Sequence, residues 1–409
     1  MSNGAGNMGT NISIGMFDEI LNSDSYSVVS VKEKLMPAAG FEHPVAAAMY
    51  PAAEGTNPNR FLGGANIVDR GGTSSVIIDS IASAANRRDR AMLDSQELRS
   101  LLPTVEFEVE GKIFHIMEAP HRCADSSIAI NAAFDQKLQA ALVAFHNGDA
   151  APLARLDVSS LIGGFWKSRA KPGELGGMKS ARLICSQVVG LGATVASQKN
   201  VFSGSMGAQA INHDLGDAKQ EISSSGHGRV PSVDRATNKV HVNEIISTTT
   251  VSLGGIRLFR CRTKEAGWGR PRTEAEIAED LKLQRYVLGV ALVKALIVPA
   301  ATLRSECDLI QTDDPDAFTV ALKTRARADR NNPGEIFNTI AGLDLRQAMK
   351  FCALAKEDFG VENHPKPFEI KKADIRADAG VSGSAADRKK LSKSQIVAKT
   401  EPKPSAAEV

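Results

Sequence analysis

Four side chains of types that bind phosphate recur at helical spacing in one short stretch: Ser83, Asn86, Arg87 and Arg90. At 3.6 residues per turn these positions share one face of a helix. A strand-like run at 74–78 precedes them, so the face lies beside a helix start, where backbone N–H groups also attract anions. The pattern suits contact with a phosphate backbone, although an ordinary solvated helix face would show the same spacing.

Arg88 does not fit this polar face. The same spacing places it among the apolar positions Ile81, Ala85 and Met92, roughly opposite. A long arginine side chain can lie along apolar surface there and bring its charge to water. The sequence predicts no further role for Arg88.

His121, Arg122 and Asp125 lie within five residues of one another and form a possible catalytic set. Catalysis needs a base, an orienting carboxylate and a positioned reacting group. The same residues can form a turn held by side-chain hydrogen bonds, with Asp125 capping the helix that follows. We interpret the set as structural or backbone-binding, and Cys123 beside it as a small core residue rather than a nucleophile.

A basic, glycine-containing loop runs from 167 to 179. Its cations, with the arginine that follows shortly after, are Lys167, Arg169, Lys171, Lys179 and Arg182. Glycines let backbone N–H groups approach an anion closely, so the loop is a candidate for binding a polyanion. An exposed hinge loop is the alternative. The glycine and lysine order of a nucleotide-binding P-loop is absent, so no triphosphate site is predicted.

A second basic run follows the glycines at 254 and 255. It consists of Arg257, Arg260, Arg262 and Lys264. On a strand the last three side chains align on one face, and such a row can follow phosphates. The alternative is an edge strand that its charges protect from aggregation.

Composition limits the class of protein. The 409 residues carry a net charge of only +2, so nucleic-acid binding must come from local clusters. The five cysteines form no CxxC pair, and the histidines at 213, 227 and 241 lack metal-site spacing, so we expect reduced thiols, no metal and no cofactor. No apolar run reaches membrane-spanning length and no signal peptide is evident, which favours a cytoplasmic protein.

Strand and helix patterns occur without regular alternation, which favours an α+β fold. Strands are predicted at 26–35, 74–78, 105–110, 112–117, 161–166, 181–189, 248–251 and 256–259. Helices are predicted after 79 and at 128–145, 273–298 and 335–358. We expect a loose segment at 1–24, one hand-shaped domain over 25–368 with a polar excursion at 197–240, and a mobile charged tail over 369–409.

Six segments occur in one order along the chain. They are DSIASAANRRD at 79–89, APHRCADSS at 119–127, SSLIGGFWKSRAKPGELGGMKSAR at 159–182, GHGRVP at 226–231, VSLGGIRLFR at 251–260 and LRSECDL at 303–309. Together they resemble the Csb-one (Cas-seven) backbone subunit of type I-U, now type I-G, CRISPR effectors. The resemblance runs from about residue 26 to 312 and weakens in the C-terminal hundred residues.

The resemblance implies a fold and a function. Such subunits have an RRM-like, ferredoxin-type palm with inserted fingers and a thumb, for which the excursion at 197–240 is the candidate here. They are not enzymes. They polymerise head to tail along a CRISPR RNA in a Cascade complex, beside other Cas subunits, while the guide pairs with target DNA.

The resemblance also implies which side chains contact RNA. The first candidates are Ser83, Asn86, Arg87 and Arg90, with His121 and Arg122. The basic loop adds Lys167, Arg169, Lys179 and Arg182, and the second basic run adds Arg257 and Arg260.

Two other classes of protein remain open. One is a CRISPR RNA endonuclease of the same superfamily that uses His121 with Asp125 or Arg122. The other is an unrelated soluble α+β metabolic protein. Cleavage of repeat RNA would favour the first, and a clean monomer without nucleic acid would favour the second.

Overall fold

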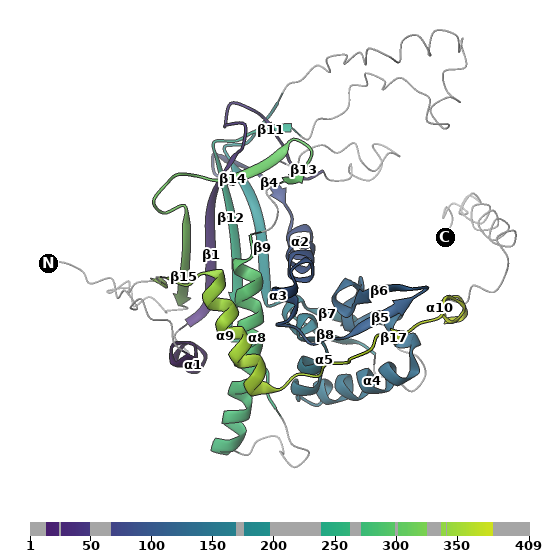
Figure 1. Ribbon diagram of the computed structural model, residues 1–409. Coiled ribbons are helices and arrows are strands. Elements are labelled where there is room, and N and C mark those ends of the chain that lie inside the picture. The colour runs from purple at the N-terminus through teal and green to yellow at the C-terminus, as the bar shows by residue number, and fades with distance from the viewer. Residues whose placement is uncertain are drawn as a thin grey trace, which may run out of the picture. The chain divides into compact units, whose positions relative to one another are not determined.

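The computed structural model describes residues 14–23, 26–49, 67–168, 176–196, 239–261, 271–298, 302–324, 337–340 and 342–378. Its contacts divide the chain into two compact units, where we had expected a single domain over 25–368. The first unit comprises Met1–Leu101, Arg182–Phe259 and Ile277–Phe359. The second comprises Leu102–Ala181, Arg260–Glu276 and Gly360–Val409. Figure 1 shows the elements of both.

The first unit is built on a large antiparallel sheet. Its described strands are β1 (Tyr26–Pro37), β3 (Ile67–Arg70), β4 (Thr73–Asp79), β9 (Ile184–Leu191), β12 (Glu244–Ser252), β13 (Thr302–Arg304), β14 (Cys307–Gln311), β15 (Phe318–Thr324) and β16 (Phe337–Thr339). The order is β13-β14-β1-β12-β9-β4-β3, and β15 pairs with β1 and β16. A small separate sheet joins β2 (Val45–Ala46), β10 (Thr194–Val195) and β11 (Lys239–His241).

The strand order confirms the mixed α+β prediction. Four central strands lie in the order β15-β1-β12-β9. Along the chain, helix α2 (Ile81–Asp94) lies between β1 and β9, and helix α8 (Glu274–Leu296) lies between β12 and β15. Two interleaved β-α-β units of this kind make the ferredoxin-type arrangement, so the order is compatible with the RRM-like palm.

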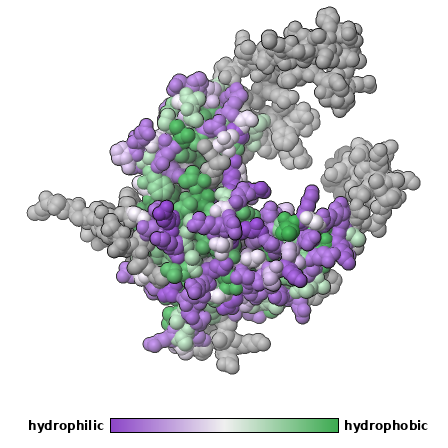
Figure 2. All heavy atoms as spheres, viewed as in Figure 1, coloured by the Kyte–Doolittle hydropathy of each residue, from purple (hydrophilic) through white to green (hydrophobic). Residues whose placement is uncertain are grey.

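One face of the sheet carries the buried core. Burial alternates along β12, and the register sets its buried Thr249 and Val251 beside Val31 and Val29 of β1. Alternate residues of a strand point to opposite faces. Lys32 and Thr248 therefore lie on the other face, where Lys32 is exposed. On the visible surface of the first unit, Figure 2 shows hydrophobic residues gathered where Figure 1 places β1, β12 and β9.

Helices α8 and α9 (Leu345–Phe359) run side by side in the first unit (Figure 1). A Cβ added at Gly289 of α8 would lie 2.8 Å from the Cα of Cys352 on α9, so glycine permits this close approach. Helix α1 (Ile14–Asn22) packs against α9 through Phe17 and Phe351, whose rings stack 3.9 Å apart. The helix lies within 1–24, where we had expected no regular structure.

The second unit combines short sheets with helices. Its strands are β5 (Glu106–Val109), β6 (Lys112–His115), β17 (Phe368–Glu369), β7 (Phe165–Lys167) and β8 (Met178–Ser180). Its helices include α4 (Ala132–His146), α5 (Ala151–Gly163) and α10 (Lys372–Asp378). The predicted 105–117 hairpin is confirmed, with positive φ at Glu110 and Gly111 in its turn. Phe107 packs its ring against Phe134 and Phe368.

Three local predictions were wrong. Residues 161–163 end helix α5 and are not a strand. The helix was not predicted because this segment is buried on every side and its sequence shows no helical period. Residues 253–256 form the short helix α7 (Leu253–Ile256), where the Ser252 hydroxyl accepts the Gly255 amide, and no strand covers 256–259. The late helix begins at Leu345, and part of the segment before it is strand β16.

The predicted helix over 273–298 is confirmed as α8. Thr273 and Glu276 form a reciprocal capping box, in which each side chain accepts the other residue's backbone N–H. No helix in the described ranges is long and apolar enough to span a membrane. Of the excursion predicted at 197–240, residues 197–238 lie outside the described residues, and 239 and 240 belong to β11. Of the tail predicted over 369–409, the part beyond 378 lies outside them, and the part before it includes α10.

Candidate nucleic-acid interface

The predicted passage from strand to helix at residue 79 is confirmed. Strand β4 ends at Asp79, and α2 begins at Ile81. Ser80 caps the helix, because its hydroxyl accepts the Ser83 backbone N–H at 3.3 Å. The other N–H groups of the first turn lack partners within the helix and attract anions. Helix α2 therefore presents its first turn close to the edge of the sheet.

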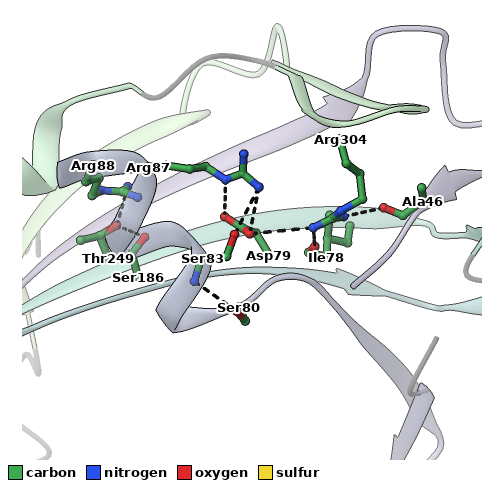
Figure 3. Close-up of polar contacts among 10 residues, drawn as sticks. All are labelled: Ala46, Ile78, Asp79, Ser80, Ser83, Arg87, Arg88, Ser186, Thr249 and Arg304. Carbon is green, nitrogen blue, oxygen red and sulfur yellow. Dashed lines mark hydrogen bonds and ion pairs between the residues drawn. The ribbon is translucent and has the colours of Figure 1, made fainter. Parts of the chain in front are cut away.

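Arg87 is held by a buried carboxylate. Its Nε donates to Asp79 at 3.2 Å and its Nη2 to the same carboxylate at 3.4 Å (Figure 3). The Asp79 side chain is 2% exposed, whereas that of Arg87 is 25% exposed. Nη2 also donates to the Ser83 hydroxyl at 3.3 Å. These bonds fix the direction of the Arg87 side chain, which remains partly exposed to solvent.

Arg304 shares Asp79 with Arg87. Its guanidinium lies 3.9 Å from the Asp79 carboxylate. It also donates to the carbonyls of Ala46 and Ile78, at 2.7 and 2.8 Å (Figure 3). Two cations therefore neutralise one buried anion, and the cluster joins α2 and β4 to the segments at 46 and 304.

The two remaining members of the predicted polar face, Asn86 and Arg90, are free of the core. Asn86 is exposed, and Arg90 is 70% exposed. Arg90 pairs with Asp94 at 2.8 Å across one helical turn, an exposed pair that contributes little and is easily exchanged for another anion. The predicted face is therefore divided: Asn86 and Arg90 are accessible, while Ser83 and Arg87 are tied to Asp79.

Arg88 points into the sheet. It is 5% exposed and donates to the Thr249 hydroxyl at 3.0 Å, which in turn bonds Ser186 at 2.8 Å (Figure 3). Burial lowers the pKa of its guanidinium, and Glu33 and Asp79 oppose that shift through their charge. The next residue, Asp89, forms a buried ion pair with Lys294 of α8. Arg88 and Asp89 together fix the rotation of α2.

His121 lies in a turn that Asp125 holds. The Asp125 carboxylate accepts the backbone N–H of His121 at 3.0 Å and both the N–H and hydroxyl of Ser127. Burial opposes ionisation, but these hydrogen bonds outweigh it and lower the Asp125 pKa. The carboxylate thus bonds the His121 backbone, as the structural interpretation of this segment requires.

Arg122 packs against the end of α5. It has a positive φ of 51° and donates from Nη1 to the Gly164 carbonyl at 3.3 Å. A Cβ at Gly163 would lie 2.6 Å from its Cζ, so Gly163 leaves room for the guanidinium. Cys123 beside it is buried, and burial raises the pKa of its thiol far above the usual range. Cys123 is therefore a core residue, as predicted.

The basic-loop residues have different environments. Lys167 is 8% exposed and donates to Gln139 at 3.2 Å, so it does not face solvent as a free cation. Lys179 is exposed on β8, and Arg182 is exposed just before β9. Arg169 lies outside the described residues.

Arg257 and Arg260 of the second basic run lie in the described part of the chain, outside any strand. Arg257 caps the C-terminus of α1, donating to the carbonyls of Leu21 and Ile20 at 2.8 and 2.7 Å. Arg260 is half-buried, and its carbonyl accepts the Ala150 N–H at 2.9 Å. Residues 253–256 form helix α7, so Arg257 follows a helix and not a strand. Arg262 and Lys264 lie outside the described residues.

Within the described part of the chain, no group of three histidine, cysteine or acidic side chains is placed to hold a metal ion. Neither Arg304 nor Trp166 was among the site residues predicted from the sequence. Arg304 bonds segments distant in sequence, so no local pattern marks it. Trp166 stands beside the basic loop, and that proximity was an available signal.

The fold and site define an α+β protein that displays amide and cationic side chains along α2 and on β8. Residues 29–195 match the family model described as CRISPR-associated protein GSU0053. That region, which includes β4, α2 and the β7–β8 hairpin, is therefore similar to a CRISPR-associated protein family. No curated protein matches the chain.

Proposed function

We propose that the chain is a non-catalytic backbone subunit of a type I-U (I-G) CRISPR effector, which binds the guide RNA and assembles along it. The observation that carries the proposal is the polar face of α2. There Asn86 and Arg90 are accessible beside Arg87, whose direction a buried carboxylate fixes. The family match includes this segment.

The geometry suits the sugar-phosphate backbone rather than a base sequence. An asparagine amide and arginine guanidinium groups donate hydrogen bonds to phosphate and ribose oxygens, which carry no sequence information. Arg87 is oriented before RNA arrives, so less side-chain entropy is lost on binding. Recognition of target DNA would then fall to base pairing with the guide.

Assembly along RNA accounts for the small net charge. One subunit with few phosphate contacts binds weakly, but consecutive subunits on one RNA reinforce each other through effective concentration. A net charge of +2 is therefore sufficient for a subunit that acts in series. Homotypic contacts and other Cas subunits are the expected protein partners.

Co-expression with a CRISPR array and the other Cas subunits tests the proposal. We expect RNA of uniform length in a high-mass assembly with the purified chain, and no cleavage of repeat RNA by the chain alone. Arg90→Ala should weaken RNA binding. Arg346→Ala is the matched control, because it removes the same charge from an exposed position on α9.

Two results would overturn the proposal. Cleavage of repeat RNA that His121→Ala abolishes would indicate the endonuclease. A nucleic-acid-free monomer, under conditions where the other subunits assemble, would indicate a protein of another class.

A further inference from the structure

Trp166 is exposed on a strand whose other residues are buried. Its exposed fraction is 69%, while its neighbours Phe165 and Lys167 are 7% and 8% exposed. Tryptophan usually buries most of its large surface in a core or interface. Among the described residues it is the most exposed aromatic side chain. A tryptophan displayed in this way indicates a binding partner.

The hairpin holds Trp166 in a fixed position. On one side the Phe165 ring lies 5.5 Å from that of Phe145 on α4, and Lys167 bonds Gln139 on the same helix. The carbonyl of Lys167 also accepts the Gly177 N–H at 2.8 Å, which closes the hairpin. The residues before and after Trp166 are thus both anchored to α4, and the Trp166 side chain points to the opposite face of the strand.

A cation lies directly opposite the tryptophan. The register of β7 and β8 pairs Trp166 with Lys179, and both side chains are exposed. Directly paired residues of an antiparallel ladder have Cβ atoms about 5 Å apart on one face. The hairpin therefore presents a flat ring and an ammonium group side by side.

We propose that Trp166 stacks against an unpaired base of single-stranded nucleic acid, while Lys179 contacts the adjoining phosphate. The inference rests on the proposed function and adds to it a second contact, on the other structural unit. Aromatic rings bind bases of any sequence in this way, because every base has a π-face. A protein partner is less suited, because the other exposed residues described in this hairpin, Ser168, Gly177 and Lys179, are small or polar and form no apolar patch with the ring.

Tryptophan fluorescence provides a direct readout. The chain has two tryptophans, so Trp268→Phe leaves Trp166 as the single reporter. Guide-length oligouridylate should quench its emission, because stacking brings the base against the indole. The same RNA with abasic riboses should bind through its phosphates and leave the emission unchanged.

Affinity measurements separate stacking from charge. Trp166→Ala should weaken oligouridylate binding about tenfold, a typical effect for one stacked base, and leave the salt dependence unchanged. Lys179→Ala should lower the slope of log affinity against log salt by about 0.7, the value for one phosphate contact. Ile113→Ala is the matched control: it truncates another exposed apolar residue of the second unit and should change neither quantity.

The outcomes distinguish this inference from the proposed function. If the unaltered chain binds neither RNA, the proposed function fails and this inference with it. If it binds RNA with unchanged Trp166 emission, and Trp166→Ala binds equally well, only the stacking site is overturned. Loss of binding to another Cas subunit by Trp166→Ala, with RNA affinity intact, would also overturn it and assign the ring to a protein interface.

Discussion

Substitution of Arg87 should cost folding stability as well as RNA affinity, because Arg87 neutralises a buried carboxylate. Breaking a fully buried ion pair by removing one partner costs about 3–5 kcal/mol. Two features reduce the figure for Arg87→Ala. The arginine side chain is 25% exposed, and Arg304 remains 3.9 Å from Asp79. We therefore expect the free energy of unfolding to fall by about 1–2 kcal/mol.

Arg87→Glu should lower the free energy of unfolding further than Arg87→Ala. It places a second carboxylate beside Asp79, which is 2% exposed and cannot be hydrated in place. The expected loss is about 3–5 kcal/mol, the range for an uncompensated buried charge. A charge reversal at this position therefore cannot separate loss of RNA binding from loss of fold, and the alanine variant is the better probe.

Urea unfolding followed by circular dichroism provides the assay, with Arg90→Ala as control. Arg90 forms only an exposed pair with Asp94, so its removal should cost about 0.3 kcal/mol. Combining Asp79→Asn with Arg87→Ala completes a double-mutant cycle, and we expect a coupling energy of about 1 kcal/mol. The reasoning is refuted if Arg87→Ala costs no more than Arg90→Ala, or if the cycle shows no coupling.

Three further predictions concern the framework. Arg257→Ala should release α1, lowering stability by about 1–3 kcal/mol and opening residues 14–22 to limited proteolysis, with no change in the salt dependence of RNA binding; unchanged proteolysis would refute the capping role. Gly289→Ala should lower the melting temperature because its Cβ would meet the Cα of Cys352, whereas Gly254→Ala, with no atom within 4 Å, should not; equal melting of the two variants would contradict the close packing. Burial raises the pKa of Cys307 to about 11 and of Cys352 to about 12, from 9.0. Both should therefore resist alkylation at pH 8 until the chain is denatured, and stability should decline as the pH rises above about 9, where the unfolded thiols ionise first; rapid native alkylation would contradict this.

Elements with a strong local signal could be predicted from the sequence. In the sequence of β1, apolar residues at 29, 31 and 35 alternate with polar residues at 30, 32 and 34. The β5–β6 hairpin has glycine in its turn, and α8 begins at a capping box. Helix α5 could not be predicted, because nearly all its side chains are buried and Asp157 interrupts its backbone. Strands β14 and β15 depend on pairing with β1, which lies far back along the chain, and no local pattern shows this.

The candidate site was predicted in part. Helical spacing alone placed Asn86 and Arg90 at the surface, since exposure on a helix follows its period. The pairing of Arg87 with Asp79 could not be predicted without knowing the angle between β4 and α2. The capping role of Arg257 could not be predicted without knowing the position of α1. Arg88 was placed among the apolar positions, but its hydroxyl partner lies on a strand far along the chain.

Ultraviolet cross-linking of the assembled complex, followed by mass spectrometry, tests the central claim most directly. The claim is that this chain holds guide RNA on the polar face of α2. We predict that peptides covering residues 80–95 carry cross-linked ribonucleotide, and that Arg90→Ala, but not Arg346→Ala, reduces the yield. An assembly that contains guide RNA with no cross-link in those peptides would contradict the claim.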